Sequence, residues 1–131
     1  MKIDWKALYD SADQARARAH APYSKFKVGA AIACTDGSVI AACNVENASF
    51  GLTICAERSA IARMVAEGKK LAAVAIVVDS ADPTPPCGMC RQVMAEFADK
   101  DLEVRSRNTK GAEAIYTLGE LLPHAFTAKF L

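Results

Sequence analysis

Three cysteines and one glutamate have the residue types and spacing of a catalytic metal site. Cys87 and Cys90 form a Cys-x-x-Cys pair, and Cys55 begins a Cys-x-Glu triplet that ends at Glu57. A catalytic zinc ion takes three protein ligands and keeps its fourth position for water. A carboxylate two residues beyond one ligand can reach that water without binding the metal. The pattern therefore predicts one zinc ion held by three thiolates, with Glu57 moving the protons.

Two other interpretations explain less of this pattern. A redox dithiol shares the Cys-x-x-Cys spacing, but it would follow an early strand and leave Cys55 and Glu57 without a role. A purely structural zinc would need a fourth ligand close by. His20 and His124 each stand alone, near a helix end or a proline, so we expect them to have structural or surface roles. The joint pattern, Cys-x-Glu followed by Pro-Cys-x-x-Cys, is the signature of zinc-dependent deaminases.

Three thiolates pose an electrostatic problem, because their charge exceeds that of the zinc ion. A net negative site resists the loss of a proton from water. Helix N-termini at both ligand motifs would stabilise the thiolates. Two arginines could also compensate, since Arg58 directly follows the glutamate and Arg91 follows the last cysteine. We hypothesise that Arg58 donates a hydrogen bond to a ligand sulfur and offsets its charge.

The two remaining cysteines lie on a predicted hairpin. We expect Cys34 and Cys43 to be small buried residues rather than ligands. Pairing across the Asp36-Gly37 turn would set Cys34 near Val39 and Cys43 near Ala30. The two thiols would not be opposite each other, so a disulfide between them is not expected.

Hydrophobic periodicity and turn residues indicate the elements that would position these groups. The expected helices cover about 4–20, 55–67 and 88–98, with a last turn at 118–122, and the expected strands are 28–34, 39–43, 71–78, 102–105 and 114–117. Asp4 is the expected N-cap of the first helix, and Gly68 follows the second as its C-cap glycine. On the second and third helices, Val65 and Phe97 are expected to face inward.

This order of elements predicts an α/β fold, a three-layer α/β/α sandwich around a mixed five-stranded sheet. The 71–78 segment is an unbroken apolar run, which is typical of a strand buried on both faces. A length of 131 residues is expected to make a single domain covering residues 1–131.

Charge and hydropathy narrow the classes of partner. Sixteen basic and fifteen acidic residues give a net charge of +1, which argues against a polynucleotide partner. Arg105, Arg107 and Lys110 come close together, and we expect them in a solvated loop between strands. No apolar run approaches the roughly 20 residues that cross a bilayer, and no signal-peptide core is evident. We therefore expect a cytosolic protein without a membrane partner.

The sequence closely resembles the cytidine deaminase family of the small homotetrameric type. The resemblance runs nearly end to end and is carried by five segments: 22–30 (PYSKFKVGA), 44–47 (NVEN), 55–58 (CAER), 86–92 (PCGMCRQ) and 121–126 (LLPHAF). It implies one zinc ion per subunit and hydrolysis of free cytidine or deoxycytidine to uridine or deoxyuridine, a step of pyrimidine salvage. Glu57 would shuttle protons from the activated water to the base and its leaving amino group.

The resemblance also implies substrate contacts. Phe26 would pack against the pyrimidine ring, and Asn44 and Glu46 would hydrogen-bond the ribose hydroxyls. Glu57 and the backbone N–H of Ala56 would hold the base. Phe50 and Phe126 resemble aromatic residues that such enzymes contribute to the pocket of a neighbouring subunit. Without the resemblance, all three phenylalanines would be interpreted as core residues.

Two rival functions remain open at this point. Blasticidin-S deaminases have about this size and the same zinc motifs, although the Asn44-Val45-Glu46-Asn47 segment favours an unmodified ribose. A non-enzymatic zinc-binding module is the other rival. Such a module has no use for a carboxylate such as Glu57 aimed at an open coordination position.

Overall fold

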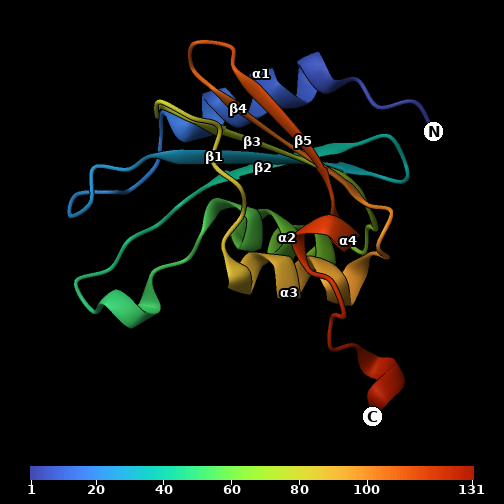
Figure 1. Cartoon of the computed structure of the whole chain (residues 1–131). Helices are drawn as coiled ribbons and strands as arrows, with labels where there is room; N and C mark the ends of the chain where they lie inside the picture. The colour runs from blue at the N-terminus through green and yellow to red at the C-terminus, as the bar shows by residue number, and fades with distance from the viewer.

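The computed structural model describes residues 1–131 as one five-stranded sheet with helices on both faces (Figure 1). The elements in chain order are α1 (Trp5–Arg16), β1 (Val28–Cys34), β2 (Val39–Cys43), η1 (Phe50–Leu52), α2 (Ala56–Ala66), β3 (Leu71–Val78), α3 (Gly88–Phe97), β4 (Glu103–Asn108), β5 (Glu113–Thr117), α4 (Leu118–Leu121) and η2 (Ala128–Phe130). The strand order is β2-β1-β3-β4-β5. Only β3 and β4 run parallel, with α3 as their crossover, so the expected mixed sheet is confirmed.

The apolar strand β3 lies at the centre of the sheet and is covered on both faces. Alternate residues belong to two hydrophobic clusters, with Val74 and Ile76 facing α2 and α3, and Ala73 and Ala75 facing α1. Figure 1 shows α1 on one side of the sheet and α2, α3 and α4 on the other. The three-layer arrangement expected from the sequence is therefore present.

Small residues let α1 approach the sheet closely. The face beneath it carries Ala31 and Ala33 of β1. A Cβ on Gly29 would lie 1.8 Å from the carbonyl oxygen of Ala12, so only glycine fits there. Asp4 caps α1 as expected, because its carboxylate accepts a hydrogen bond of 3.0 Å from the Ala7 N–H.

The second and third helices both begin at a cysteine. Cys55 is the N-cap residue of α2 and Cys87 that of α3. Gly68 follows α2 with a φ of 69°, and the N–H of Lys69 donates to the Met64 carbonyl at 3.0 Å, which confirms the expected glycine cap. Figure 1 shows α2 and α3 on the same side of the sheet, so the two cysteines that begin these helices also lie on that side.

Several expected boundaries and orientations were wrong. The first helix ends at Arg16 rather than near His20, because His20 pairs with Val45 in an isolated bridge. Val65 and Phe97, expected to face inward, are 49% and 41% exposed. Each helix buries only some of its apolar residues, and these two lie outside the buried face. The fourth strand runs from Glu103 to Asn108, so it begins one residue later and ends three residues later than expected.

The hairpin register also differs by one residue from the expected one. Ala33 pairs with Val39 and Gly29 with Cys43, whereas the expected two-residue turn put Cys34 opposite Val39. The turn is longer because the N–H of Cys34 donates to the Ser38 carbonyl at 2.8 Å. Cys34 is fully buried, as predicted, and Cys43 is half-buried at the edge of the sheet.

Candidate active site

The three cysteines of the predicted zinc site converge between the starts of α2 and α3. The Sγ atoms of Cys55 and Cys87 are 3.6 Å apart, and those of Cys87 and Cys90 are 3.4 Å apart. All three sulfurs lie within 4.8 Å of one another. A tetrahedral zinc with Zn–S bonds of about 2.3 Å places its sulfurs about 3.8 Å apart. The thiols therefore fit one zinc ion.

The local structure explains why these thiols suit a metal. Neither N-cap cysteine uses its side chain to cap its own helix, so both sulfurs are left for a ligand. The pKa of the Cys55 thiol is lowered to about 5 by its interactions with Cys90 and then with Arg58. The pKa of Cys90 is raised by its interaction with Cys55 and by burial. One sulfur of the cluster is thus favoured as thiolate even before a metal neutralises the others.

Glu57 points into the same site from the first turn of α2. Its side chain is only 4% exposed, and burial raises the pKa of its carboxyl to about 7. The carboxylate lines a pocket of about 250 Å³ together with Cys55 and Cys87. A buried carboxyl beside a metal-binding cluster has the placement of a general acid and base.

The two arginines next to the motif have different partners. Arg58 Nη2 donates to the Thr53 carbonyl at 3.3 Å and lies 3.9 Å from Cys55 Sγ, one of the sulfurs to which the hypothesis assigns it. Arg91 does not face a thiol. Its Nε donates to the Pro86 carbonyl at 2.7 Å and its Nη1 to the Leu121 carbonyl at 2.8 Å. Arg91 therefore ties the loop before Cys87 to α4 rather than compensating the charge of the thiolates.

The pocket also brings together most of the expected substrate contacts. Phe26, Asn44, Glu46 and Ala56 line it with the thiols and Glu57. These residues come from the segment before β1, the end of β2 and the start of α2. The main-chain pairing that stops α1 at Arg16 also brings them together, because the N–H of Glu46 donates to the His20 carbonyl at 2.8 Å.

Asn44 has a second task that the sequence did not indicate. Its Nδ2 donates to the Phe26 carbonyl at 2.8 Å and its Oδ1 accepts from the Val28 N–H at 2.9 Å. The amide is 7% exposed. Asn44 therefore holds the backbone on both sides of Lys27 and fixes Phe26 at the rim of the pocket.

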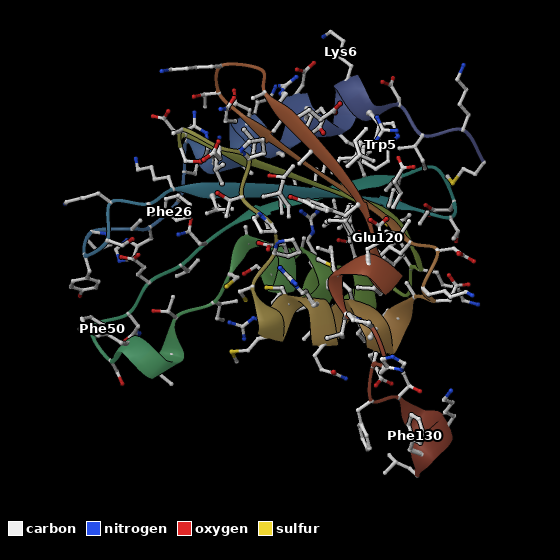
Figure 2. The ribbon with its side chains drawn as sticks, in the orientation of Figure 1. Trp5, Lys6, Phe26, Phe50, Glu120 and Phe130 are labelled. Carbon is white, nitrogen blue, oxygen red and sulfur yellow. The ribbon has the colours of Figure 1, made fainter.

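Phe50 and Phe126 do not line the pocket of their own chain. Phe50 is 73% exposed and packs edge-on against Tyr23, at a ring distance of 5.7 Å. Phe126 lies beyond α4 and stacks on Phe130. Figure 2 shows Phe26 and Phe50 on one side of the molecule, and Phe130 at the tip of the C-terminal segment.

Residues outside the pattern also shape the site. Asn108, 2% exposed, donates to the Ser80 and Ala81 carbonyls at 3.1 and 3.0 Å, and so holds the proline-rich loop that leads to Cys87. An asparagine at the end of a strand gave no signal of this role. His124 lies in a separate hollow of about 410 Å³ beside α3 and α4, far from the thiols.

Of the three basic residues expected in a solvated loop, only Lys110 lies in the exposed turn between β4 and β5, and the two arginines are part of the sheet. Arg105 and Arg107 lie on β4 and face α1. The Arg105 guanidinium is 4.2 Å from the Trp5 ring centre, and that of Arg107 is 4.5 Å from the Tyr9 ring centre. Their aromatic partners are 100 and 98 residues away in the chain, which is why spacing alone predicted a loop.

Comparison with known proteins agrees with this geometry. The family model described as the cytidine and deoxycytidylate deaminase zinc-binding region matches residues 3–105. No helix of the structure is both long and apolar enough to span a bilayer.

Individual relatives extend the match to nearly the whole chain. A cytidine deaminase from Halalkalibacterium halodurans is 50% identical over 128 residues, which is 97% of each chain. The crystal structure of cytidine deaminase from Burkholderia pseudomallei is 47% identical, covers 95% of this chain and 100% of its own, and superposes with a TM-score of 0.91. A blasticidin-S deaminase from Bacillus cereus is more distant, at 32% identity over 113 residues, or 79% of each chain.

Proposed function

The chain belongs to the family of zinc-binding cytidine and deoxycytidylate deaminases, and we propose that Cys55, Cys87 and Cys90 hold its zinc ion while Glu57 moves the protons. The reaction is the hydrolytic deamination of cytidine to uridine. One observation carries the residue assignment. Three thiols converge at the starts of α2 and α3, and two of them, Cys55 and Cys87, line one pocket with the buried carboxyl of Glu57.

The proposed mechanism gives each proton to a named atom. Bound zinc supplies Lewis-acid activation of the attacking water. Glu57 takes one proton from that water and delivers it to N3 of the base, which makes C4 the electrophile. After the water oxygen has bonded to C4, Glu57 carries the second proton to the amino group. The C4–N bond then breaks, ammonia leaves, and the C4 carbonyl of uridine remains.

The pocket would bind both parts of the nucleoside, the base and the ribose. Phe26 packs against the pyrimidine ring, and the backbone N–H of Ala56 joins Glu57 in anchoring the base. Asn44 and Glu46 hydrogen-bond the ribose hydroxyls. The support for these roles is that all five residues line one pocket. Deoxycytidine keeps the 3′-hydroxyl and would be a second substrate.

Arg58 would reduce the negative charge of a three-thiolate site. Its Nη2 lies 3.9 Å from Cys55 Sγ. The same nitrogen donates to the Thr53 carbonyl at 3.3 Å, which holds the guanidinium beside the sulfur. A donor at this position withdraws charge from the sulfur and keeps the zinc ion electrophilic.

We also propose a homotetramer with composite active sites. Phe50 and Phe126 are 73% and 59% exposed, and neither lines its own pocket. Phe130 and Leu131 are exposed too, at 60% and 95%, on the C-terminal segment that extends from the body in Figure 1. Large apolar side chains gathered on projecting segments are typical of subunit contacts.

The cellular role would be pyrimidine salvage in the cytoplasm. Three of the five cysteines must stay reduced to bind zinc, and all five are free thiols in the structure. A reducing compartment meets that requirement.

The assignment of Glu57 is tested with Glu57→Gln, which keeps the shape of the side chain and removes its proton transfer. We expect kcat for cytidine to fall by about 10²–10⁴, the usual contribution of a general acid and base. Zinc content, measured with a colorimetric chelator after unfolding, should stay at one ion per chain. The decay of cytidine absorbance gives the rate. Full turnover by Glu57→Gln would refute the assignment.

The same assay separates the two deaminase functions. Zinc-loaded protein is mixed with cytidine, deoxycytidine and blasticidin S in turn, and the ratio kcat/KM is compared. A preference for blasticidin S would favour the alternative function. Turnover of none of the three would favour a non-enzymatic zinc module.

A further inference from the structure

The hydroxyl of Ser24 joins two residues of the proposed substrate pocket. It donates a hydrogen bond to Glu46 Oε2, and it accepts one from the N–H of Phe26 at 3.0 Å. Ser24 itself lines the pocket with both of these residues. One side-chain atom is therefore bonded at once to the segment before β1 and to the segment after β2.

Glu46 depends on this segment for its orientation. Its Oε1 accepts from the N–H groups of Tyr23 and Ser24, at 3.0 and 3.1 Å. An ionised carboxylate offers about four acceptor positions. Three are occupied by residues 23 and 24, so roughly one remains for a ligand hydroxyl. Of the three donors, only the Ser24 hydroxyl is a side-chain group. Its bond to Oε2 therefore determines which acceptor position of Glu46 stays free.

The backbone around Ser24 is shaped to make these contacts. Lys25 has a φ of 61°, an unusual value for a residue with a side chain. This conformation turns the chain back, and the N–H of Lys25 donates to the Ala21 carbonyl at 3.0 Å. After the turn, the Asn44 amide hydrogen-bonds the backbone of Phe26 and Val28. Local strain of this kind is retained where surrounding contacts fix it.

We propose that Ser24 is a positioning residue for the sugar, which aims the Glu46 carboxylate at the ribose hydroxyls. The proposal rests on the proposed role of Glu46 in binding ribose. The hydrogen bond from the Ser24 hydroxyl is also the largest cause that lowers the pKa of Glu46, an acidic side chain that is ionised at neutral pH in any case. An ionised acceptor binds a hydroxyl about twice as strongly as a neutral one.

The test compares two nucleosides in Ser24→Ala and Ser24→Thr. Cytidine carries the 2′- and 3′-hydroxyls, and 2′,3′-dideoxycytidine lacks both and keeps only the 5′-hydroxyl. For Ser24→Ala we expect KM for cytidine to rise about tenfold, the equivalent of about 1.4 kcal/mol, with kcat little changed. The dideoxy substrate should show no matching rise. Ser24→Thr keeps a hydroxyl and should restore most of the affinity for cytidine.

Ser38→Ala is the matched control. Ser38 also donates its hydroxyl to a nearby carboxylate, Asp36 at 2.6 Å, but it lies in the β1–β2 turn away from the pocket. Its KM values for both substrates should equal those of the unaltered protein. An equal rise of KM for both substrates in Ser24→Ala would overturn the proposal, because the serine would then act on the whole loop.

Glu46→Gln separates a failure of this inference from a failure of the proposed function. If Glu46→Gln leaves the preference for cytidine over the dideoxy substrate intact, the role of Glu46 itself is wrong. If Glu46→Gln abolishes the preference and Ser24→Ala does not, the role of Glu46 stands and the role of Ser24 is overturned.

Discussion

At the scale of single residues, the charge of the thiolate cluster is the main constraint on the chemistry. Three thiolates around a divalent ion leave about one negative charge, which opposes the loss of a proton from water. The α2 and α3 N-termini offset part of this charge, because Cys55 and Cys87 are their N-cap residues. Arg58 is the nearest full positive charge, with Nη2 at 3.9 Å from Cys55 Sγ.

Arg58→Ala is therefore expected to lower kcat for cytidine by about 10- to 100-fold, the worth of about 1.5–3 kcal/mol for a charged hydrogen bond. The loss should appear in kcat, because Arg58 does not line the substrate pocket. Initial rates from cytidine absorbance, with zinc content measured on the same samples, give the answer.

Arg63→Ala is the control for this substitution. Arg63 is on the same helix and pairs with Glu67 at 2.6 Å, with its side chain 63% exposed. Arg63→Ala removes the same charge as Arg58→Ala but leaves the surroundings of the thiols unchanged. The rate of this variant should therefore stay within about twofold of that of the unaltered protein, as for most surface substitutions. Equal losses in the two variants would mean that the total charge matters and the contact with the sulfur does not.

The grouping of the three thiols and Glu57 was predictable because its signal is local. Cys55 and Glu57 are two positions apart, and Cys87 and Cys90 one helical turn apart. The contacts of Arg91 and Asn108 were not predictable, since their partners are main-chain carbonyls. A backbone carbonyl has no sequence signature.

At the scale of elements, the close approach of α1 to the sheet depends on one glycine. Gly29→Ala would place a methyl group 1.8 Å from the Ala12 carbonyl oxygen, so α1 must move away from β1. Overpacking costs about 1–3 kcal/mol and more where backbone must shift, and we expect a loss of at least about 3 kcal/mol in the free energy of unfolding. Urea denaturation followed by circular dichroism measures it.

Gly51→Ala serves as the comparison. A Cβ there meets nothing within 4 Å, and its φ is not positive. Its midpoint in urea should be nearly unchanged. A small effect of Gly29→Ala, similar to that of Gly51→Ala, would show that α1 can shift at little cost.

Zinc joins the starts of α2 and α3, so its removal should loosen these two helices without unfolding the sheet. Stabilisation by a bound ion is about 4 kcal/mol when its free concentration is 1,000 times Kd. For a chain of this size that corresponds to a fall of about 10 °C or more in Tm after chelation. Far-UV circular dichroism should stay close to that of the zinc-loaded protein, because only one of the proposed ligands, Cys90, belongs to the main apolar core.

Two cysteine variants check that the effect comes from the cluster. Cys43→Ala, at the edge of the sheet, should keep the full shift on chelation. Cys87→Ser should begin with the lower Tm and show little further change. An unaltered Tm after chelation of the native protein would contradict the link between the helices.

Element boundaries were predictable where the side chains of the element itself determine them. They were not predictable where backbone hydrogen bonds to other segments determine them. The strands Val28–Cys34, Val39–Cys43 and Leu71–Val78 have the bounds that the apolar runs indicated. The end of α1 and the hairpin register depend instead on backbone hydrogen bonds made by His20 and by Ser38. Such bonds form only in the folded chain, so helical and turn propensities could not predict them.

At the scale of the whole molecule, Phe50 and Phe126 stand out because neither lines the pocket of its own chain. Both are more than half exposed, and both lie on segments that project from the body. If each completes the pocket of a neighbour, Phe50→Ala and Glu57→Gln damage pockets in different ways. The first removes a contact from the neighbouring chain, and the second removes the proton carrier of its own chain.

A mixed assembly of these two inactive chains should therefore regain activity. Where the two kinds of chain adjoin, the pocket of a Phe50→Ala chain keeps its Glu57 and receives Phe50 from its Glu57→Gln neighbour. Co-refolding both variants and following cytidine absorbance measures the recovery. A mixture of Glu57→Gln with Cys87→Ser is the control, because both changes act within a chain's own pocket and no exchange can repair them. Recovery in the first mixture alone requires shared pockets. Its absence, or an active monomer in sedimentation velocity, would place every functional residue within a single chain and leave the exposure of Phe50 and Phe126 to be explained by surface packing alone.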